Sequence, residues 1–244
     1  MYRFFLAEPF APLLRITGSD AHHISHVLRM KKGEALQIVS LDQVAAVMKI
    51  TAFGEGWVEV ALDHELTEAH EPTVRITLIQ GLPKQDKMEW VIQKAVELGV
   101  TEILPAMMEH SVVRIDAAKA ARKTERWQKI AEASAKQSKR DIIPRIALPE
   151  PLPAILRACD ADLKLLPYEA EGSRGLREAL RASGDVRSAA FVIGPEGGIS
   201  QAEYALAAEL GFLPVSLGPR ILRTETAALA ALSAILYETG NLGG

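Results

Sequence analysis

The residues best suited to chemistry in this sequence form a short turn, Gly194–Gly198, with the sequence Gly-Pro-Glu-Gly-Gly. The turn directly follows a hydrophobic run, Phe191–Ile193. Ser200 and Glu203 come next with the spacing of a capping box, so we expect a helix to begin there. Open α/β sheets bind ligands where a buried strand ends in such a turn. The pattern therefore predicts a small-molecule site at the carboxyl end of a strand.

A second strand end of the same kind follows shortly afterwards along the chain. The strand predicted over Leu213–Leu217 runs into the turn Gly218–Thr226, and an alanine- and leucine-rich helix comes after it. Parallel strands end at the same edge of a sheet, so loops from neighbouring strands can meet there. We predict that the two loops line one pocket that holds a small molecule.

Several common kinds of site do not fit these loops. No glycine is followed by Lys-Ser or Lys-Thr, so the sequence has no P-loop. A dinucleotide fingerprint is disfavoured because Pro195 and Glu196 lie where a diphosphate would approach. An acidic side chain repels an anionic ligand and tolerates a cationic or neutral one. The first loop thus favours a ligand that is not an anion.

We expect no metal site and no disulfide. The sequence has no C-x-x-C pair, and Cys159 is the only cysteine. His22, His23 and His26 cluster on one predicted helix, where they either bind a metal or form a polar surface that faces a partner; the second interpretation is preferred. A single cysteine suits a reducing cytoplasm. No apolar run approaches the roughly 20 residues that a membrane span requires.

The charge distribution has two interpretations. A formal net charge of −3 argues against a generally basic nucleic-acid-binding protein. The segment Arg114–Arg145, however, is rich in Lys and Arg and poor in acidic residues. Such a segment is either a solvated helix face or a surface for the phosphates of a polyanion.

The first part of the chain, residues 1–70, predicts a small β-barrel. Short runs rich in β-branched residues are separated by turn formers and predict strands. One helix is expected over Asp20–Met30, with Asp20 as its N-cap and with Ile24, Val27 and Leu28 on its buried side. The polar stretch His64–Pro72 is the expected linker. The expected strands are Leu36–Val39, Val44–Ile50 and Trp57–Leu62.

The remainder, residues 73–244, alternates strands and helices, which is typical of a mainly parallel sheet in an α/β domain. We expect a helix that is capped by Asp86 and ends at Gly99, and a long basic helix from Ala117 to about Ser138. The expected strands before the two loops are Val74–Gln80, Ile103–Pro105, Arg145–Leu148 and Leu163–Leu166.

Taken together, these motifs resemble those of the RsmE family, SPOUT-superfamily methyltransferases that modify N3 of a uridine in small-subunit (16S) ribosomal RNA. The similarity covers nearly the whole chain, and the paired C-terminal loops are its most specific part. The matching segments are Gly194–Gly198, Leu217–Ala227, His26–Arg29 with Gly33, Lys87–Glu89, Gln93–Val100, Arg126–Ile130 and Gln137–Arg140 with Pro144.

The resemblance implies an N-terminal PUA-like β-barrel and a C-terminal SPOUT-type α/β domain with a deep trefoil knot. It also implies S-adenosyl-L-methionine as the cofactor, ribosomal RNA or the small ribosomal subunit as the partner, and a homodimer. Gly194 and Gly198 would allow close approach to the cofactor, and the second loop would receive its adenine. The implied cofactor-binding residues are Leu166, Gly194, Pro195, Glu196, Gly198, Leu217, Gly218, Ile221, Leu222 and Thr226.

Three residues are candidates for catalysis. Uracil N3 is a poor nucleophile while protonated, so a neighbouring group must accept that proton. Glu225 or Glu196 is a candidate acceptor, and Arg223 would stabilise negative charge on the uracil oxygens. The alternatives are that Glu225 caps the last helix, and that Arg223 holds a phosphate or pairs with Glu225. The residues predicted to hold RNA are Arg3, Arg15, Arg29, Lys32, Arg122 and Arg126.

The last helix, Ala227–Leu236, is apolar on nearly every face, which indicates burial on more than one side. A dimer interface achieves this, and so does packing within one domain. A non-catalytic RNA-binding or ribosome-assembly factor, and a SPOUT enzyme that acts on another nucleotide, stay open as alternative functions.

Overall fold

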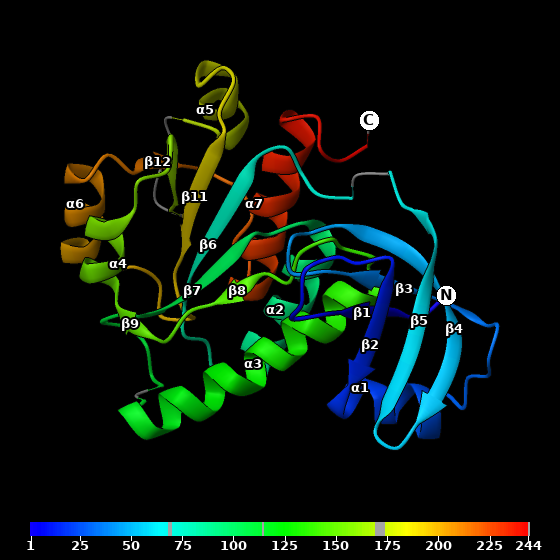
Figure 1. Cartoon of the computed structure of the whole chain (residues 1–244). Coiled ribbons are helices and arrows are strands. Elements are labelled where there is room, and N and C mark those ends of the chain that lie inside the picture. The colour runs from blue at the N-terminus through cyan, green and yellow to red at the C-terminus, as the bar shows by residue number, and fades with distance from the viewer. Residues whose placement is uncertain (68–69, 114, 169–173, 244) are drawn as a thin grey trace. The chain divides into compact units, whose positions relative to one another are not determined.

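The computed structural model describes residues 1–67, 70–113, 115–168 and 174–243, and its contacts divide the chain into two units (Figure 1). The first unit comprises Met1–Glu71 together with Ala135–Ile142, and the second comprises Pro72–Ser134 and Ile143–Gly244. Residues 135–142 thus belong to the first unit and not, as predicted from the sequence, to the second.

The first unit contains a five-stranded sheet with the strand order β1-β3-β4-β5-β2. β1 runs parallel to β3, and the other neighbours are antiparallel. In the described residues no pairing joins β1 to β2, so hydrogen bonds between strands do not close the sheet. The strands are β1 (Arg3–Phe5), β2 (Leu13–Thr17), β3 (Ala35–Val39), β4 (Ala45–Gly54) and β5 (Trp57–Glu65).

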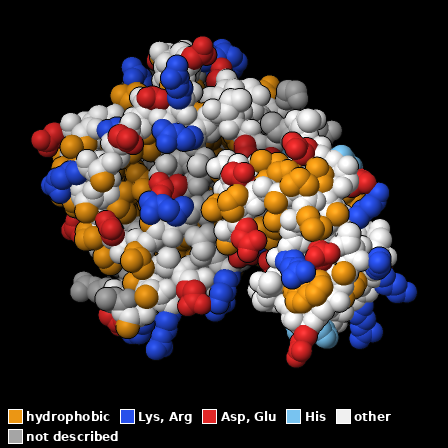
Figure 2. Space-filling view, viewed as in Figure 1, with side chains coloured by type: hydrophobic (Ala, Val, Ile, Leu, Met, Phe, Trp, Pro, Cys, Tyr) orange, Lys and Arg blue, Asp and Glu red, His pale blue; other side chains and the backbone are white. Residues whose placement is uncertain are grey.

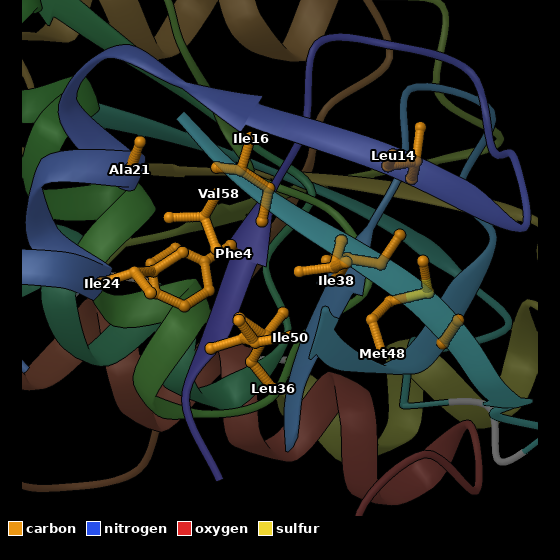
Figure 3. Close-up of a cluster of buried hydrophobic side chains, with 12 residues drawn as sticks. Phe4, Leu14, Ile16, Ala21, Ile24, Leu36, Ile38, Met48, Ile50 and Val58 are labelled. Carbon is orange, nitrogen blue, oxygen red and sulfur yellow. The ribbon is translucent and has the colours of Figure 1, made fainter. Parts of the chain in front are cut away.

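The core of the first unit follows from the alternation of apolar residues along its strands. In β2, Leu14 and Ile16 are buried while their neighbours are exposed. Figure 3 shows these side chains packed with Phe4, Ile24 and Met48, which come from other elements of the unit. Full burial of one such side chain contributes about 1.5–3 kcal/mol to the free energy of folding, so this cluster favours the folded state of the first unit.

The first helix differs from its predicted form. Helix α1 (Gly18–His22) begins before Asp20, its N-cap is Thr17, and a π-helical turn, η1 (His23–Val27), follows it. A π turn holds more residues than an α turn, so the 3.6-residue period no longer decides which side chains point inward. Val27, which was expected to be buried, is 61% exposed.

The second unit contains a seven-stranded sheet in which every pairing between the described strands is parallel. Its main strand order is β12-β10-β11-β6-β7-β8, and β9 also pairs with β7. All the residues of β11 are buried, as expected for a strand covered on both faces. The strands are β6 (Arg75–Gly81), β7 (Glu102–Met107), β8 (Arg145–Ile146), β9 (Glu150–Pro151), β10 (Leu163–Pro167), β11 (Ser188–Ile193) and β12 (Leu213–Val215).

Six further helices accompany the sheet in the described residues. Helices α2 and α7 pack on each other, and α4 packs against α6. None of the described helices has the length and apolar character needed to cross a bilayer. The helices are α2 (Lys87–Leu98), α3 (Ala117–Gln137), α4 (Leu152–Ala158), α5 (Leu176–Ala182), α6 (Gln201–Glu209) and α7 (Thr224–Glu238).

The C-terminal end of α2 agrees with the sequence prediction, but its N-terminal cap does not. Gly99 closes the helix in the left-handed conformation, with φ of 117°, as the sequence predicted. Asp86 lies at the N-cap but makes no side-chain cap hydrogen bond. The carboxylate of Glu89, in the first turn, accepts a hydrogen bond from Arg126 at 2.8 Å. The predicted strand over 145–148 is shorter, because only Arg145 and Ile146 pair with β7.

Candidate active site

The two loops singled out in the sequence line two pockets that share a wall. The first pocket has a volume of about 550 Å³ and is lined by residues 216–222 of the second loop. The other, of about 490 Å³, is lined by residues 193–199 together with Arg223 and Thr224. Volumes of this size suit a small organic ligand. Both pockets are lined by Tyr168, Ile221, Leu222 and Ala227.

Thr224, the first residue of α7, joins the two loops. Its hydroxyl donates to the carbonyl oxygen of Gly194 at 2.6 Å, and the buried Gln80 at the end of β6 donates to the same hydroxyl at 2.9 Å. This chain of hydrogen bonds connects the ends of β6 and β11 to the start of α7. The sequence analysis did not identify Gln80 or Thr224 as site residues.

Close backbone packing explains two of the glycines around the first loop. A Cβ atom at Gly81 would lie 2.6 Å from Cδ of Pro195, and one at Gly197 would lie 2.9 Å from the carbonyl oxygen of His110. Contacts this short do not occur for real Cβ atoms, so the loop fits against the ends of β6 and β7 only because both residues are glycines. His110 Nδ1 is also 2.9 Å from the carbonyl oxygen of Gly197.

The predicted capping box is present at the start of α6. The Ser200 hydroxyl accepts a hydrogen bond from the Glu203 amide, and the Glu203 carboxylate accepts one from the Ser200 amide. Glu203 also accepts from the amide of Glu109, at 2.8 Å. The far end of the first loop is therefore fixed to the residues that follow β7.

Three charged side chains meet beside the first loop. Nζ of Lys87, the first residue of α2, lies 3.0 Å from the carboxylate of Glu196 and 3.3 Å from that of Glu225. Glu196 also accepts hydrogen bonds from the amide of Lys84, at 3.1 and 3.2 Å. Lys87 is a site residue that the sequence analysis missed, although it lies in one of the segments quoted for the family resemblance.

The pKa of Glu196 lies below its usual value. Burial raises this pKa, but hydrogen bonds from the residue's own amide, from Lys87 and from the amide of Lys84 lower it by more. The pKa of Lys87 is raised, above all by its hydrogen bond to Glu196. Both side chains are therefore charged near neutral pH.

Arg223 lines the pocket and lies at the N-cap position of α7. Among the described residues no ion pair joins Arg223 to Glu225, whose carboxylate instead pairs with Lys87. Oε2 of Glu225 is buried, and its contact with Lys87 is an ion pair that lacks the geometry of a hydrogen bond. Glu225 lies in the first turn of α7, where its charge complements the helix dipole, but it forms no side-chain cap.

Two of the predicted cofactor-binding residues do not line either pocket. Leu166 is fully buried in the core of the second unit, and Thr226 is exposed beside Ala227. The side chain that reaches both pockets after β10 belongs to Tyr168, two residues beyond Leu166. Gly194, Pro195, Glu196, Gly198, Leu217, Gly218, Ile221 and Leu222 line one or both pockets.

Arg3 was predicted to contact RNA, and this prediction is wrong. Its side chain is 1% exposed, because it pairs with Asp141 and donates to the carbonyl oxygen of Lys139 within the first unit. Both partners come from residues 135–142, which are distant from Arg3 in the sequence but belong to the same unit. Arg3 therefore holds this unit together and is not available to a ligand.

The other predicted RNA-binding side chains are exposed. Arg15 pairs with Glu59 and lies over the Trp57 ring, and Arg29 has a left-handed φ of 53°. Arg122 and Arg126 project from α3, where Figure 2 shows Lys and Arg side chains interleaved with acidic ones. Lys32 is exposed in the loop before β3.

Two of the three clustered histidines contact each other. His22 and His26 stack with their ring centroids 4.6 Å apart. In the part of the chain that the structure describes, no group of His, Cys, Asp or Glu side chains is placed to bind a metal ion.

Comparisons with known proteins agree with the architecture. Residues 70–236 match the model of an RNA methyltransferase domain, and residues 16–60 match that of an RNA methyltransferase PUA domain. The ribosomal RNA small subunit methyltransferase E of Bacillus subtilis is 38% identical over 96% of this chain and 93% of its own length. The enzyme of the same name from a Buchnera aphidicola strain is 32% identical over 94% of this chain and 92% of its own.

A solved structure with a bound ligand is also similar. It is a ribosomal RNA small subunit methyltransferase E from Neisseria gonorrhoeae bound to S-adenosyl methionine, with a TM-score of 0.84, 32% identity and 97% of each chain covered. The family resemblance drawn from the sequence motifs is thus confirmed. The chain belongs to the RNA methyltransferase family, with a PUA domain before its methyltransferase domain.

Proposed function

We propose that this protein transfers a methyl group from S-adenosyl-L-methionine to N3 of a uridine in the RNA of the small ribosomal subunit. One observation carries the proposal most directly. The paired loops of a methyltransferase domain line adjoining pockets, one of which contains Lys87, Glu196 and Arg223, and Lys87 also pairs with Glu225. The names of the relatives support ribosomal RNA as the substrate class.

The residues present fit a cationic methyl donor. Lys87, Glu196 and Glu225 together carry one net negative charge, and one buried oxygen of Glu225 has no hydrogen-bond partner among the described residues. Leu217, Gly218, Ile221 and Leu222 would hold the adenine, and Gly194, Pro195, Glu196 and Gly198 would lie along the remainder of the donor. When bound, the donor supplies a methyl carbon activated by its sulfonium, and the electron pair of the broken bond stays on sulfur.

The protein's own residues must orient the uracil and move its N3 proton. Glu196 already accepts hydrogen bonds from the Lys84 amide and pairs with Lys87, so its oxygens are occupied. Glu225 has fewer partners: its Oε2 pairs with Lys87 at 3.3 Å and makes no hydrogen bond among the described residues, so we assign the proton to Glu225. Arg223 would stabilise the negative charge that develops on the uracil oxygens.

The test is methylation of defined RNA by the purified protein, followed by mass spectrometry of the nucleosides. We expect 3-methyluridine in small-subunit RNA, with either the naked RNA or the assembled particle as substrate. If another base or a ribose is methylated instead, the proposed target, uridine N3, is wrong and the methylated atom is the target. Calorimetry that detects no binding of S-adenosylmethionine would favour a non-catalytic RNA-binding or assembly factor.

The first unit, with exposed residues of α3, would hold the RNA. Arg15, Arg29, Lys32, Arg122 and Arg126 present cationic side chains that suit phosphates. The target uridine must be unstacked, because N3 lies on the edge that pairs with another base. A ribosomal substrate places this activity in the cytoplasm.

We also propose that the second unit forms a homodimer through α7 and that its C-terminal segment forms a deep trefoil knot. Ile221 is 85% exposed, and Tyr237 is exposed near the end of α7. Ala230, Ala234 and Tyr237 line a further groove beside α5, which gives the partner an apolar surface. A crystal structure in which residues 217–238 are traced continuously will test the knot, and sedimentation will test the dimer.

A further inference from the structure

Lys87 lies between the two carboxylates that the proposed function treats as alternatives. It is the first residue of α2, where the partial positive charge of the helix dipole disfavours a cation. Its ammonium group is nonetheless held there by Glu196 at 3.0 Å and Glu225 at 3.3 Å. An electrostatically unfavourable lysine that is compensated by two acids in a pocket is a candidate for a functional role.

The two carboxylates depend on Lys87 to different degrees. Glu196 has a second anchor in the amide of Lys84, so its position does not require the lysine. Glu225 has no such anchor: in the described residues its carboxylate has one ion-pair partner, Lys87, and its Oε2 makes no hydrogen bond. Removing Lys87 would therefore free Glu225 while Glu196 stays in place.

We infer that Lys87 is a positioning residue for methyl transfer, acting through Glu225 by holding that carboxylate in place with an ion pair. The inference rests on the proposed function, because it assumes that Glu225 accepts the N3 proton. Lys87 would not itself take that proton, since its hydrogen bond to Glu196 above all raises its pKa.

The first test compares Lys87→Met and Glu225→Gln with the wild-type protein in single-turnover methylation at saturating donor and RNA. Each variant is expected to lose about a hundredfold in rate, the low end of the range for general acid–base groups. Lys87→Arg, which keeps the charge, is expected to recover at least roughly a tenth of the wild-type rate. The matched control is Lys94→Met on the same helix, which breaks an ion pair with Glu97 away from the pockets and should leave the rate unchanged.

The double variant Lys87→Met/Glu225→Gln separates a coupled role from an independent one. If Lys87 acts through Glu225, the double variant is no slower than Glu225→Gln alone. If the fold reductions in rate of the two single variants multiply in the double variant, Lys87 acts independently of Glu225 and the inference is wrong. Lys87→Met at the wild-type rate would also overturn it.

The affinity for S-adenosylmethionine, measured by calorimetry, serves as the structural control. It should change by less than about threefold in Lys87→Met, because Thr224, the Lys84 amide and the Ser200–Glu203 capping box still hold the first loop. A loss of affinity as large as the loss of rate would make Lys87 a cofactor ligand and contradict a positioning role. If Lys87→Met does not fold, Lys87→Gln takes its place in every comparison.

The pH profile of the single-turnover rate provides a further readout. Glu196 and Glu225 pair with Lys87, and Arg223 lines the same pocket as Lys87. A carboxylate that loses a neighbouring cation holds its proton to higher pH. The acidic limb should therefore move to higher pH in Lys87→Met, and an unmoved limb would contradict the inference. If the wild-type protein fails to methylate uridine, the proposed function fails instead, so the two failures are distinguishable.

Discussion

The hydroxyl of Thr224 donates a hydrogen bond of 2.6 Å to the carbonyl oxygen of Gly194 and so ties the start of the last helix to the first loop of the pocket. Gln80 completes the connection from β6. We predict that Thr224→Val, which keeps the shape but loses the hydroxyl, lowers the free energy of unfolding by about 1–3 kcal/mol, the cost of unsatisfied buried polar groups. Denaturant unfolding measures this loss, and Thr224→Ser should restore most of it. If Thr224→Val is as stable as the wild-type protein, the connection is not needed.

Arg223→Ala tests the stabilisation of charge on the uracil. The exposed side chain lies at the rim of the pocket, and the described structure shows no ion pair between it and Glu225, so its loss should leave the fold intact. We expect turnover to fall by about 10²–10³-fold, as for other groups that stabilise a developing anion. Affinity for S-adenosylmethionine should stay within several-fold. Near-normal turnover would remove Arg223 from the mechanism.

Glu196 should contribute stability that depends on pH. Because its folded-state pKa is lowered, its contribution is fully present above the ordinary value of 4.5 and is lost as the pH falls through the lowered folded value. The wild-type protein should therefore be more stable than Glu196→Gln at neutral pH, and the difference should shrink on acidification below 4.5. Denaturant unfolding at several pH values provides the measurement. A difference that grows on acidification would contradict the assigned direction.

Replacing Arg29 should affect RNA binding, whereas replacing Arg3 should affect the stability of the fold. Replacing the exposed Arg29 and Lys32 by alanine should weaken RNA binding and reduce the slope of log affinity against log salt by roughly one for each phosphate that is no longer bound. Arg3→Ala should leave Asp141 without its buried partner and cost on the order of 3 kcal/mol of stability. Filter binding across a salt series and thermal unfolding separate the two effects. An unchanged salt slope for the double variant would exclude these side chains from the RNA surface.

The proposed dimer predicts that Ala230→Arg yields a monomer. Ala230 is exposed on α7 in the apolar groove, and arginine is a good helix former, so the helix itself should tolerate the change. The matched control is Ala205→Arg, at an exposed alanine of α6. Sedimentation velocity should then show a dimer for the wild-type and control proteins only. A wild-type monomer, or a dimeric Ala230→Arg variant, would refute this interface.

Local signals with a single physical outcome could be predicted from the sequence. The capping box of Ser200 and Glu203 and the left-handed Gly99 were found because side-chain spacing and glycine conformation decide them locally. The cap expected from Asp86 makes no side-chain hydrogen bond, and the carboxylate of Glu89 accepts one from the distant Arg126.

Contacts between residues that are distant in the sequence explain most of the other differences between prediction and structure. Nothing near Arg3 in sequence reveals that Asp141 lies beside it, and an exposed basic residue has the same local pattern as a buried one. Lys87 was missed as a site residue for the same reason, since Glu196 and Glu225 reach it from distant parts of the chain. The π-helical turn after His22 shifted Val27 outward because the predicted period assumed an uninterrupted α-helix.

The double attachment of Glu203, to its own helix cap and to the amide of Glu109, has a consequence for turnover. Thr224 holds the other end of the first loop, so hydrogen bonds restrain this loop at both ends. The second loop is less restrained: Ile221 is 85% exposed, and among the described residues few backbone hydrogen bonds hold residues 219–222. We therefore expect the second loop to govern the release of the used cofactor, so that changes there alter the steady-state rate before they alter the chemical step.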